Sequence, residues 1–155
     1  MPYIRVYNRS QEPNVWRFQQ RVVLDWENYT PDSKPVDKAF ILRAIAVDGN
    51  GAVSKPVTAT YFVGLEEYSK GNVVSLVVDP DDFWGENGIY VTGEAYDLWY
   101  SEDRTEAAPY ANFELRGRKM ERPVCFQYFS EDGTFEQNAG IRVSGGSSRN
   151  HDQKS

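Results

Sequence analysis

The sequence contains little cysteine and little histidine, with one residue of each among 155. A single cysteine cannot form an internal disulfide, and one Cys with one His does not make the usual zinc-ligand set. His151 lies in a polar tail, so Cys125 has no nearby basic partner that would make it a nucleophile. Because its surroundings, "RPVCFQYF", alternate like a strand, we expect Cys125 to be a small buried thiol.

The chain also lacks a basic excess and long apolar runs. Its formal net charge is -6, and its basic residues are interleaved with acids, which argues against nucleic-acid binding. The densest basic run, residues 116–119, lies between Glu114 and Glu121 and is typical of a solvated loop, with a phosphate-binding patch as the alternative. No apolar run approaches the roughly 18 residues of a membrane span, and the N-terminus lacks the apolar segment of a signal peptide.

Aromatic side chains, in contrast, are plentiful. They make up 14% of the residues, with 4 Trp, 10 Tyr and 8 Phe. This apolar surface is enough to build a packed core, so an intrinsically disordered chain is excluded. The length suits one ordinary domain or two small ones.

Residues 1–64 have the pattern of an all-β module. Alternating or β-branched stretches predict strands over 3–10, 38–48 and 57–64, and "DGNG" at 48–51 predicts a tight hairpin between the last two. The stretch from Val15 to Trp26 fits either a strand or a short helix. With so few strands, the expected fold is a small two-sheet sandwich of immunoglobulin-like type.

Residues 65–155 form the second predicted module, after a connection at 64–72 whose glycines and charges suggest few contacts. The apolar run Val73–Val78 is typical of a strand buried on both faces. We further expect a strand over 88–93, a long surface loop over 101–120, and a hairpin over 121–146 that turns at Asp132-Gly133.

Two polar stretches near the start of this module are weak site candidates. Asp79, Asp81 and Asp82 in "DPDD" crowd three carboxylates after a strand, as a Mg²⁺ or Ca²⁺ site would. Asp before Pro is also a common turn opener, and further oxygen ligands are lacking nearby, so we predict no metal site. "GENG" at 85–88 is interpreted as a turn in preference to a ligand contact.

The tail "SGGSSRNHDQKS" is the better candidate. Backbone N–H groups of Gly145 and Gly146 can converge on an anion, and the hydroxyls of Ser147 and Ser148 can donate to it. Positive charge comes from two further residues, Arg149 and Lys154. The P-loop spacing is absent, and a flexible polar terminus is the alternative interpretation.

Four stretches, "YFVG", "VVSLVVDPDDFWGENGIYVTG", "ERPVCFQYFSEDG" and "QNAGIRVSGGSSRNHDQKS", occur in this order. Together they resemble the front portion of the CotH family, spore-coat and related bacterial proteins with an atypical protein-kinase-like domain. The resemblance covers residues 65–155. Residues 1–64 are similar to the small β-sandwich, like the C-terminal domain of chitobiases, that often precedes that domain.

The resemblance implies a mainly β chain with an immunoglobulin-like sandwich followed by a β-rich partial N-lobe of a kinase-like domain. It implies that Gly145, Gly146, Ser147, Ser148 and Arg149 lie on the nucleotide side. Lys154 would be the lysine that contacts ATP phosphates. The whole protein would use ATP and Mg²⁺ to phosphorylate coat or cell-surface proteins, at the spore coat or cell surface. The catalytic acids would lie after residue 155, so the chain alone is expected to carry no catalytic residue, to bind no cofactor and to be inactive.

Two other functions remain open from the sequence. In one, the chain is a binding module whose tryptophans contact carbohydrate or a cell-surface partner, namely Trp16, Trp26, Trp84 and Trp99. Exposed planar rings would favour it, whereas buried rings would belong to the core. In the other, the chain is a structural component of a coat.

Overall fold

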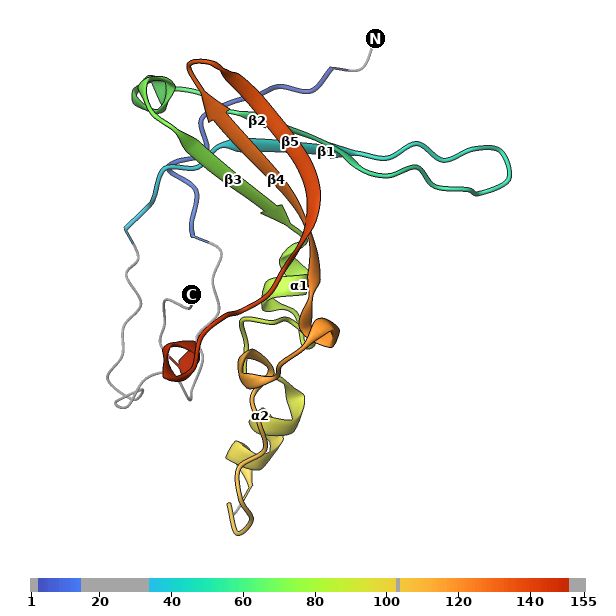
Figure 1. Ribbon diagram of the computed structural model, residues 1–155, viewed down its shortest axis with the longest axis vertical. Helices are drawn as coiled ribbons and strands as arrows, with labels where there is room; N and C mark the ends of the chain where they lie inside the picture. The colour runs from blue at the N-terminus through green and yellow to red at the C-terminus, as the bar shows by residue number, and fades with distance from the viewer. Residues whose placement is uncertain (1–2, 15–33, 103, 151–155) are drawn as a thin grey trace. The chain divides into compact units, whose positions relative to one another are not determined.

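Over the residues that the structure describes, the chain is mainly β, as predicted, with five strands in two antiparallel sheets and few helices (Figure 1). The computed structural model describes residues 3–14, 34–102 and 104–150. In chain order the elements are β1 Phe40–Ala44, β2 Val57–Tyr61, the 3-10 turn η2 Glu66–Lys70, β3 Val73–Val78, α1 Pro80–Trp84, α2 Glu94–Ser101, the 3-10 turns η3 Asn112–Glu114 and η4 Arg118–Met120, β4 Arg122–Ser130, β5 Gly133–Ile141, and the 3-10 turn η5 Ser147–Asn150.

The described residues pack into two compact units. The first holds 3–14, 34–77 and 125–138, and the second holds 78–102, 104–124 and 139–150. The predicted boundary at Gly64 therefore lies inside the first unit, where the two predicted modules share one packed region. Packing does not show whether either module folds alone, so the boundary between 1–64 and 65–155 stays a prediction.

The first sheet is the predicted hairpin of β1 and β2. The strands pair antiparallel from Phe40 opposite Tyr61 onward, and the ribbon continues as an arm beyond both strands. At the tip, the Asp48 carboxylate accepts hydrogen bonds from the backbone N–H groups of Asn50 and Ala52, both at 2.8 Å. These bonds explain why the "DGNG" sequence turns the chain here.

The second sheet has the strand order β3-β4-β5, with β4 in the centre. The β4–β5 hairpin turns where it was predicted. The expectation that β3 is buried on both faces is wrong: Val77 is only 8% exposed, but Val74 and Leu76 are 53% and 51% exposed. No described residue covers that side of this edge strand, so an almost entirely apolar sequence did not mean two buried faces.

A buried amide joins the two sheets of the first unit. Gln127 on β4 is 5% exposed. Its Oε1 accepts from Thr60 Oγ1 at 2.5 Å, and its Nε2 donates to the Thr58 carbonyl at 3.3 Å and to Glu136 Oε2 at 2.8 Å. Three strands, β2, β4 and β5, therefore meet at one side chain. Cys125, two residues earlier on β4, is 2% exposed, as predicted.

The segment 64–72 was expected to make few contacts, and most of its described residues are exposed, but two of them contact other parts of the unit. Leu65 is 6% exposed, and the Tyr68 ring stacks on Phe62 with centroids 6.5 Å apart. The Tyr68 hydroxyl donates to Asp37 at 3.0 Å, and this hydrogen bond raises the pKa of the phenol. The segment is tied to two other parts of its unit.

Residues 3–10 do not form the strand that their alternation predicted. They carry no assigned secondary structure up to a turn at Ser10, and Tyr3 and Ile4 are 89% and 63% exposed. An alternating sequence becomes a strand only where another strand accepts its backbone hydrogen bonds, and none pairs with these residues among those described.

Two helices that we did not predict begin the second unit. Asp79 caps α1 by accepting the Asp81 N–H at 3.1 Å, with Pro80 at the first helical position. This Asp-Pro pair is a known helix-start signal that the turn interpretation passed over. The core of the unit forms around α2, where Tyr96 packs with Ala111 and Phe113, which are 0% and 1% exposed.

The strand predicted over 88–93 is also wrong. The backbone N–H groups of Ile89 and Tyr90 donate to the carbonyls of Asp82 and Phe83, at 2.9 and 3.1 Å. Because α1 provides these acceptors, the segment folds back on the helix as a series of turns. Its apolar residues are nevertheless buried, with Val91 at 1% exposure.

We predict that Gln127→Ala lowers the free energy of unfolding by about 1 to 3 kcal/mol, because it leaves the buried Thr58 carbonyl and Thr60 hydroxyl without this partner. Urea unfolding followed by circular dichroism measures the change. The matched control is Gln137→Ala on exposed β5, for which we expect a change within about 0.5 kcal/mol. Equal effects of the two substitutions would show that the amide network does not hold the sheets together.

Candidate functional site

The predicted glycine-serine turn follows β5, and the structure describes it through Asn150. Gly145 has a backbone φ of 98°, a conformation that favours glycine, and the chain then enters η5, where the Arg149 N–H donates to the Gly146 carbonyl at 3.2 Å. Both the anion-binding interpretation of these residues and the alternative of a flexible polar terminus stay predictions. Lys154 lies outside the described residues, so its predicted role stays a prediction.

Arg149 is the residue that holds this turn in place. Its Nε donates to the Gly145 carbonyl at 2.7 Å, which closes the turn on itself. Its Nη1 lies 3.4, 3.4 and 3.0 Å from the carbonyls of Phe113, Glu114 and Leu115 in and after η3. The guanidinium thus joins two segments more than thirty residues apart, and its acceptors among the described residues are neutral carbonyls.

A pocket of about 470 Å³ lies beside the turn. It is formed by the end of β5, the residues after it and the loop around η4. Among the described residues, its lining includes three arginines and no acidic residue, although the whole chain has a net charge of -6. The lining residues are Leu115, Arg116, Gly117, Met120, Gly140, Ile141, Arg142, Val143, Ser144 and Arg149.

The three arginines differ in how they are held. Arg149 is fixed by backbone carbonyls, as described above. Arg142 Nε lies 3.6 Å from Glu121 Oε2, in an ion pair whose side chains are 49% and 43% exposed. Arg116 is exposed, and no described residue forms an ion pair or side-chain hydrogen bond with it. Arg149 therefore helps to shape the pocket, whereas the side chains of Arg116 and Arg142 can turn toward a bound anion.

Gly140 allows Glu121 to lie where it does. A Cβ added at Gly140 would come within 2.5 Å of Glu121 Cγ, so any larger residue would displace the carboxylate from its place near Arg142. The position of Glu121 suggests that its carboxylate is the internal counter-ion of the pocket. An incoming anion would compete with it for Arg142.

Sequence reasoning found part of this site. It named Gly145, Gly146 and Arg149, but it interpreted the run at 116–119 as a solvated loop and did not connect Arg116 or Arg142 with the turn. The contact between η3 and η5 brings these regions together. An interleaved charge pattern gives no sign of such a contact, because it is made across the fold.

The other sequence candidates have structural roles. Asp79 caps α1, and Asp82 Oδ1 lies 3.6 Å from Arg122 Nε in an ion pair. Within the described ranges no three Asp, Glu, His or Cys side chains group as metal ligands would. In the "GENG" turn, a Cβ at Gly88 would come 2.4 Å from the Phe83 carbonyl oxygen, so this glycine permits close packing against α1.

The two described tryptophans lie in aromatic clusters. Trp84 packs edge-on against Tyr90 with centroids 5.0 Å apart, and Trp99 packs on Tyr96 at 5.3 Å. Both rings are half-buried, which weakens the carbohydrate-binding interpretation for them. Trp16 and Trp26 lie outside the described residues.

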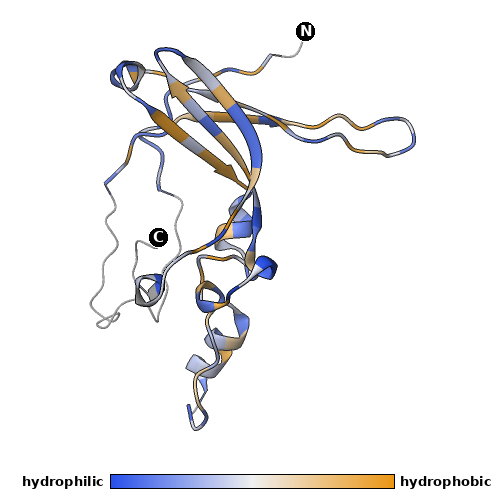
Figure 2. Ribbon diagram, viewed as in Figure 1, coloured by the Kyte–Doolittle hydropathy of each residue, from blue (hydrophilic) through white to orange (hydrophobic). Residues whose placement is uncertain are grey.

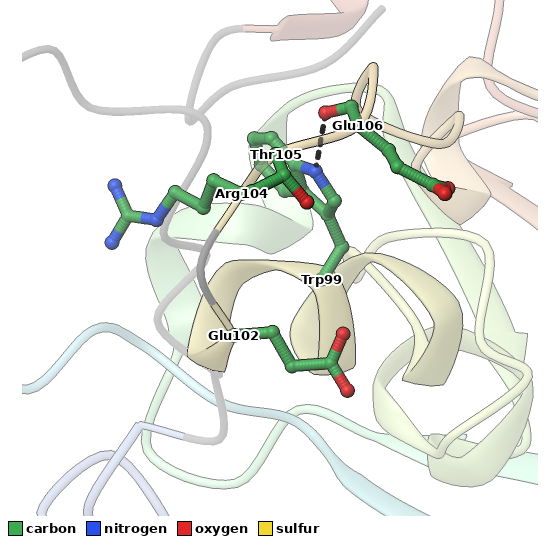
Figure 3. Close-up of a pocket in the computed structure, with 5 residues that line it drawn as sticks. All are labelled: Trp99, Glu102, Arg104, Thr105 and Glu106. Atoms are coloured by element: carbon green, nitrogen blue, oxygen red, sulfur yellow. Dashed lines mark hydrogen bonds between the residues drawn. The ribbon is translucent and has the colours of Figure 1, made fainter.

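A second pocket, of about 440 Å³, lies after α2 (Figure 3). Trp99 Nε1 donates to the Glu106 carbonyl at 2.9 Å. The Arg104 guanidinium points away from the carboxylates of Glu102 and Glu106 and instead lies over the Tyr100 ring, 4.0 Å from its centroid. Because these charged groups do not converge, the pocket is a weaker candidate than the arginine-lined one.

No helix within the described ranges is both long and apolar enough to cross a membrane. A search of family models, of curated proteins and of solved structures found no match to the chain.

We predict that Arg149→Ala loosens the turn without unfolding the chain, because the substitution removes four donor contacts to backbone carbonyls. Hydrogen exchange of the peptide covering 145–150 should speed up by about tenfold or more, as expected for losing charge-assisted hydrogen bonds. Arg118→Ala, an exposed arginine in η4 outside the pocket lining, is the control and should leave this exchange unchanged. Unchanged exchange in Arg149→Ala would refute the role of the guanidinium.

Proposed function

We propose that the arginine-lined pocket and the glycine-serine turn bind phosphate groups, and that the chain is the nucleotide-phosphate-binding portion of a CotH-type, kinase-like protein. The observation that supports this is the gathering of Arg116, Arg142 and Arg149 around one pocket in an acidic chain. Arginine presents fixed donors that match phosphate oxygens, and it keeps its charge throughout the physiological pH range.

The residues of the site would have different roles in binding phosphate. Arg149 orients the Gly145–Gly146 backbone through its carbonyl contacts, so it acts as a positioning residue. Arg142 and Arg116 carry the charges that would meet phosphate oxygens, and Ser144 lies in the same lining with a hydroxyl donor. Lys154, by resemblance, adds a further phosphate contact.

The resemblance assigns ATP and Mg²⁺ to the whole protein. Bound ATP would supply the transferable phosphoryl group. The pocket fits its phosphates because the lining is cationic, but the described part of the lining contains no carboxylate and does not suit Mg²⁺. In this proposal the metal and the catalytic acids belong to other parts of the kinase-like domain, and the chain alone binds phosphate without transferring it.

The same proposal interprets the fold. The β1–β2 hairpin with the residues around it would be the immunoglobulin-like accessory sandwich, and the β3–β4–β5 sheet would be part of the kinase-like N-lobe. Coat or cell-surface proteins would be the substrates of the whole protein, with no nucleic acid among its partners. The buried Gln127 amide that joins the two sheets is compatible with this division, because the accessory module would then pack against the lobe and stabilise it.

We predict that the chain binds ATP weakly, with Kd on the order of 1 mM at low salt, and that Arg142→Gln weakens binding about tenfold through loss of a charge-assisted contact. Arg116→Gln should act in the same direction. Titration of ATP followed by NMR chemical shifts measures both. Arg118→Gln is the matched control, since Arg118 neighbours the pocket loop but does not line the pocket. Equal losses in all three variants would indicate non-specific attraction and refute the site.

We also predict that Glu121→Gln strengthens binding of inorganic phosphate, because it removes the carboxylate that competes for Arg142. The ion pair is half-exposed, so the gain should be small, about two- to fivefold. Isothermal calorimetry or phosphorus NMR at several salt concentrations measures it. Glu114→Gln, which removes a nearby carboxylate outside the pocket lining, is the control and should have less effect. If Glu121→Gln weakened phosphate binding, the carboxylate would be supporting the site.

A further inference from the structure

The β3–β4–β5 sheet has one covered face and one open face. Gln127 and Phe129 on β4 point toward the β1–β2 side, through the hydrogen bond to Thr58 and the edge-on ring contact with Phe62 at 5.1 Å. Because side chains alternate along a strand, Phe126 and Tyr128 lie on the opposite side. We call that side the outer face.

The outer face is apolar and accessible. It is formed by Val74, Leu76, Phe126, Tyr128 and Phe135, with Phe126 and Phe135 in ring contact at 6.4 Å. Val74, Leu76 and Phe135 are 53%, 51% and 52% exposed. None of the five carries a charge, and Figure 2 shows β3 as a strongly hydrophobic strand. An apolar cluster of this kind on a folded chain marks a docking surface.

Acidic side chains lie at one end of this sheet. The η2 turn precedes β3, and the β4–β5 turn lies at the same end (Figure 1). Glu66 and Glu67 are in η2, and Glu131 and Asp132 form the β4–β5 turn, whereas Lys70 is the one basic residue in these two segments. A partner that covers the outer face therefore meets negative charge at this end.

The size of the outer face limits what can cover it. Three strands about 4.8 Å apart make a strip about 10 Å wide, which matches the diameter of one α-helix. Five side chains that are about half exposed or less offer roughly 100 Å² each. This is well below the about 800 Å² per partner of a stable protein dimer, so the face suits a single helix better than a second copy of the chain.

We infer that the outer face is a docking site for an amphipathic helix of a partner protein, one that lays an apolar stripe on Leu76 and Phe135 and directs Lys or Arg toward the acidic end. In this mode the apolar anchors supply affinity, and the charges set the direction of the helix. The site is independent of the phosphate pocket and does not rest on the proposed function.

The test uses the full chain and a synthetic helical peptide of about 14 residues with Leu along one face and Lys on the other. A second peptide carries Glu in place of Lys. Fluorescence anisotropy of the labelled peptides measures binding. We expect the Lys peptide to bind, the Glu peptide to bind at least about tenfold more weakly, and Phe135→Ser to weaken the Lys peptide about tenfold.

Three variants make the result specific. Val53→Ser removes an apolar side chain that is 60% exposed on the β1–β2 arm, so it should leave binding unchanged. Phe135→Leu keeps the face apolar and should keep most of the affinity. Neutralising the acidic end with Glu131→Gln and Asp132→Asn should weaken the Lys peptide severalfold. Circular dichroism melting checks that each variant is folded.

Several results would overturn the inference. They are absence of binding by the Lys peptide, equal binding of the two peptides, and equal losses in Phe135→Ser and Val53→Ser. Sedimentation of the chain alone provides a further check. If the chain formed a dimer that Phe135→Ser dissociated, a second copy would be the occupant of the outer face in place of a partner helix.

Discussion

The first unit depends on a buried polar group that must be satisfied. Gln127 is 5% exposed on the central strand, and an amide there is tolerable only with its hydrogen bonds made. Its partners are Thr58 and Thr60 on β2 of the other sheet and Glu136 on the neighbouring strand β5. This requirement sets how the β1–β2 hairpin lies on the sheet, since a shift of one residue would turn the partner side chains to the other face.

The second unit also depends on hydrogen bonds from polar side chains, in this case at its loops. Its apolar core is small, so polar side chains that donate to backbone carbonyls hold the long connections in place. The Asn112 amide donates to the carbonyls of Glu86 and Gly88, at 2.9 and 3.2 Å. Arg149 does the same for the glycine-serine turn. The pocket beside that turn is thus shaped by hydrogen bonds more than by apolar packing.

Charge and apolar surface are separated on this chain. Cationic groups gather at the arginine-lined pocket although the net charge is negative, while the five side chains of the outer face are uncharged. Each feature costs free energy in an isolated molecule, the first through repulsion between like charges and the second through exposure of apolar area to water. An anion in the pocket and an apolar partner on the outer face, as proposed above, would relieve these two costs.

The sequence by itself determined the structural features that depend on residues next to one another in the chain. The two hairpins, at 48–51 and at Asp132-Gly133, follow from local turn chemistry, and the buried Cys125 follows from strand alternation around it. Asp79-Pro80 also determined a helix start, although we interpreted it as a turn.

The tertiary structure decided the features that depend on contact with residues far away in the sequence. Residues 3–10 alternate but find no strand to pair with, and 88–93 bonds to α1 instead. One side of β3 stays open, and Arg116, Arg142 and Arg149 share one pocket. These outcomes depend on which residues far apart in the sequence come close enough to accept hydrogen bonds, to cover apolar side chains or to bring charges together. The sequence pattern does not record those distances.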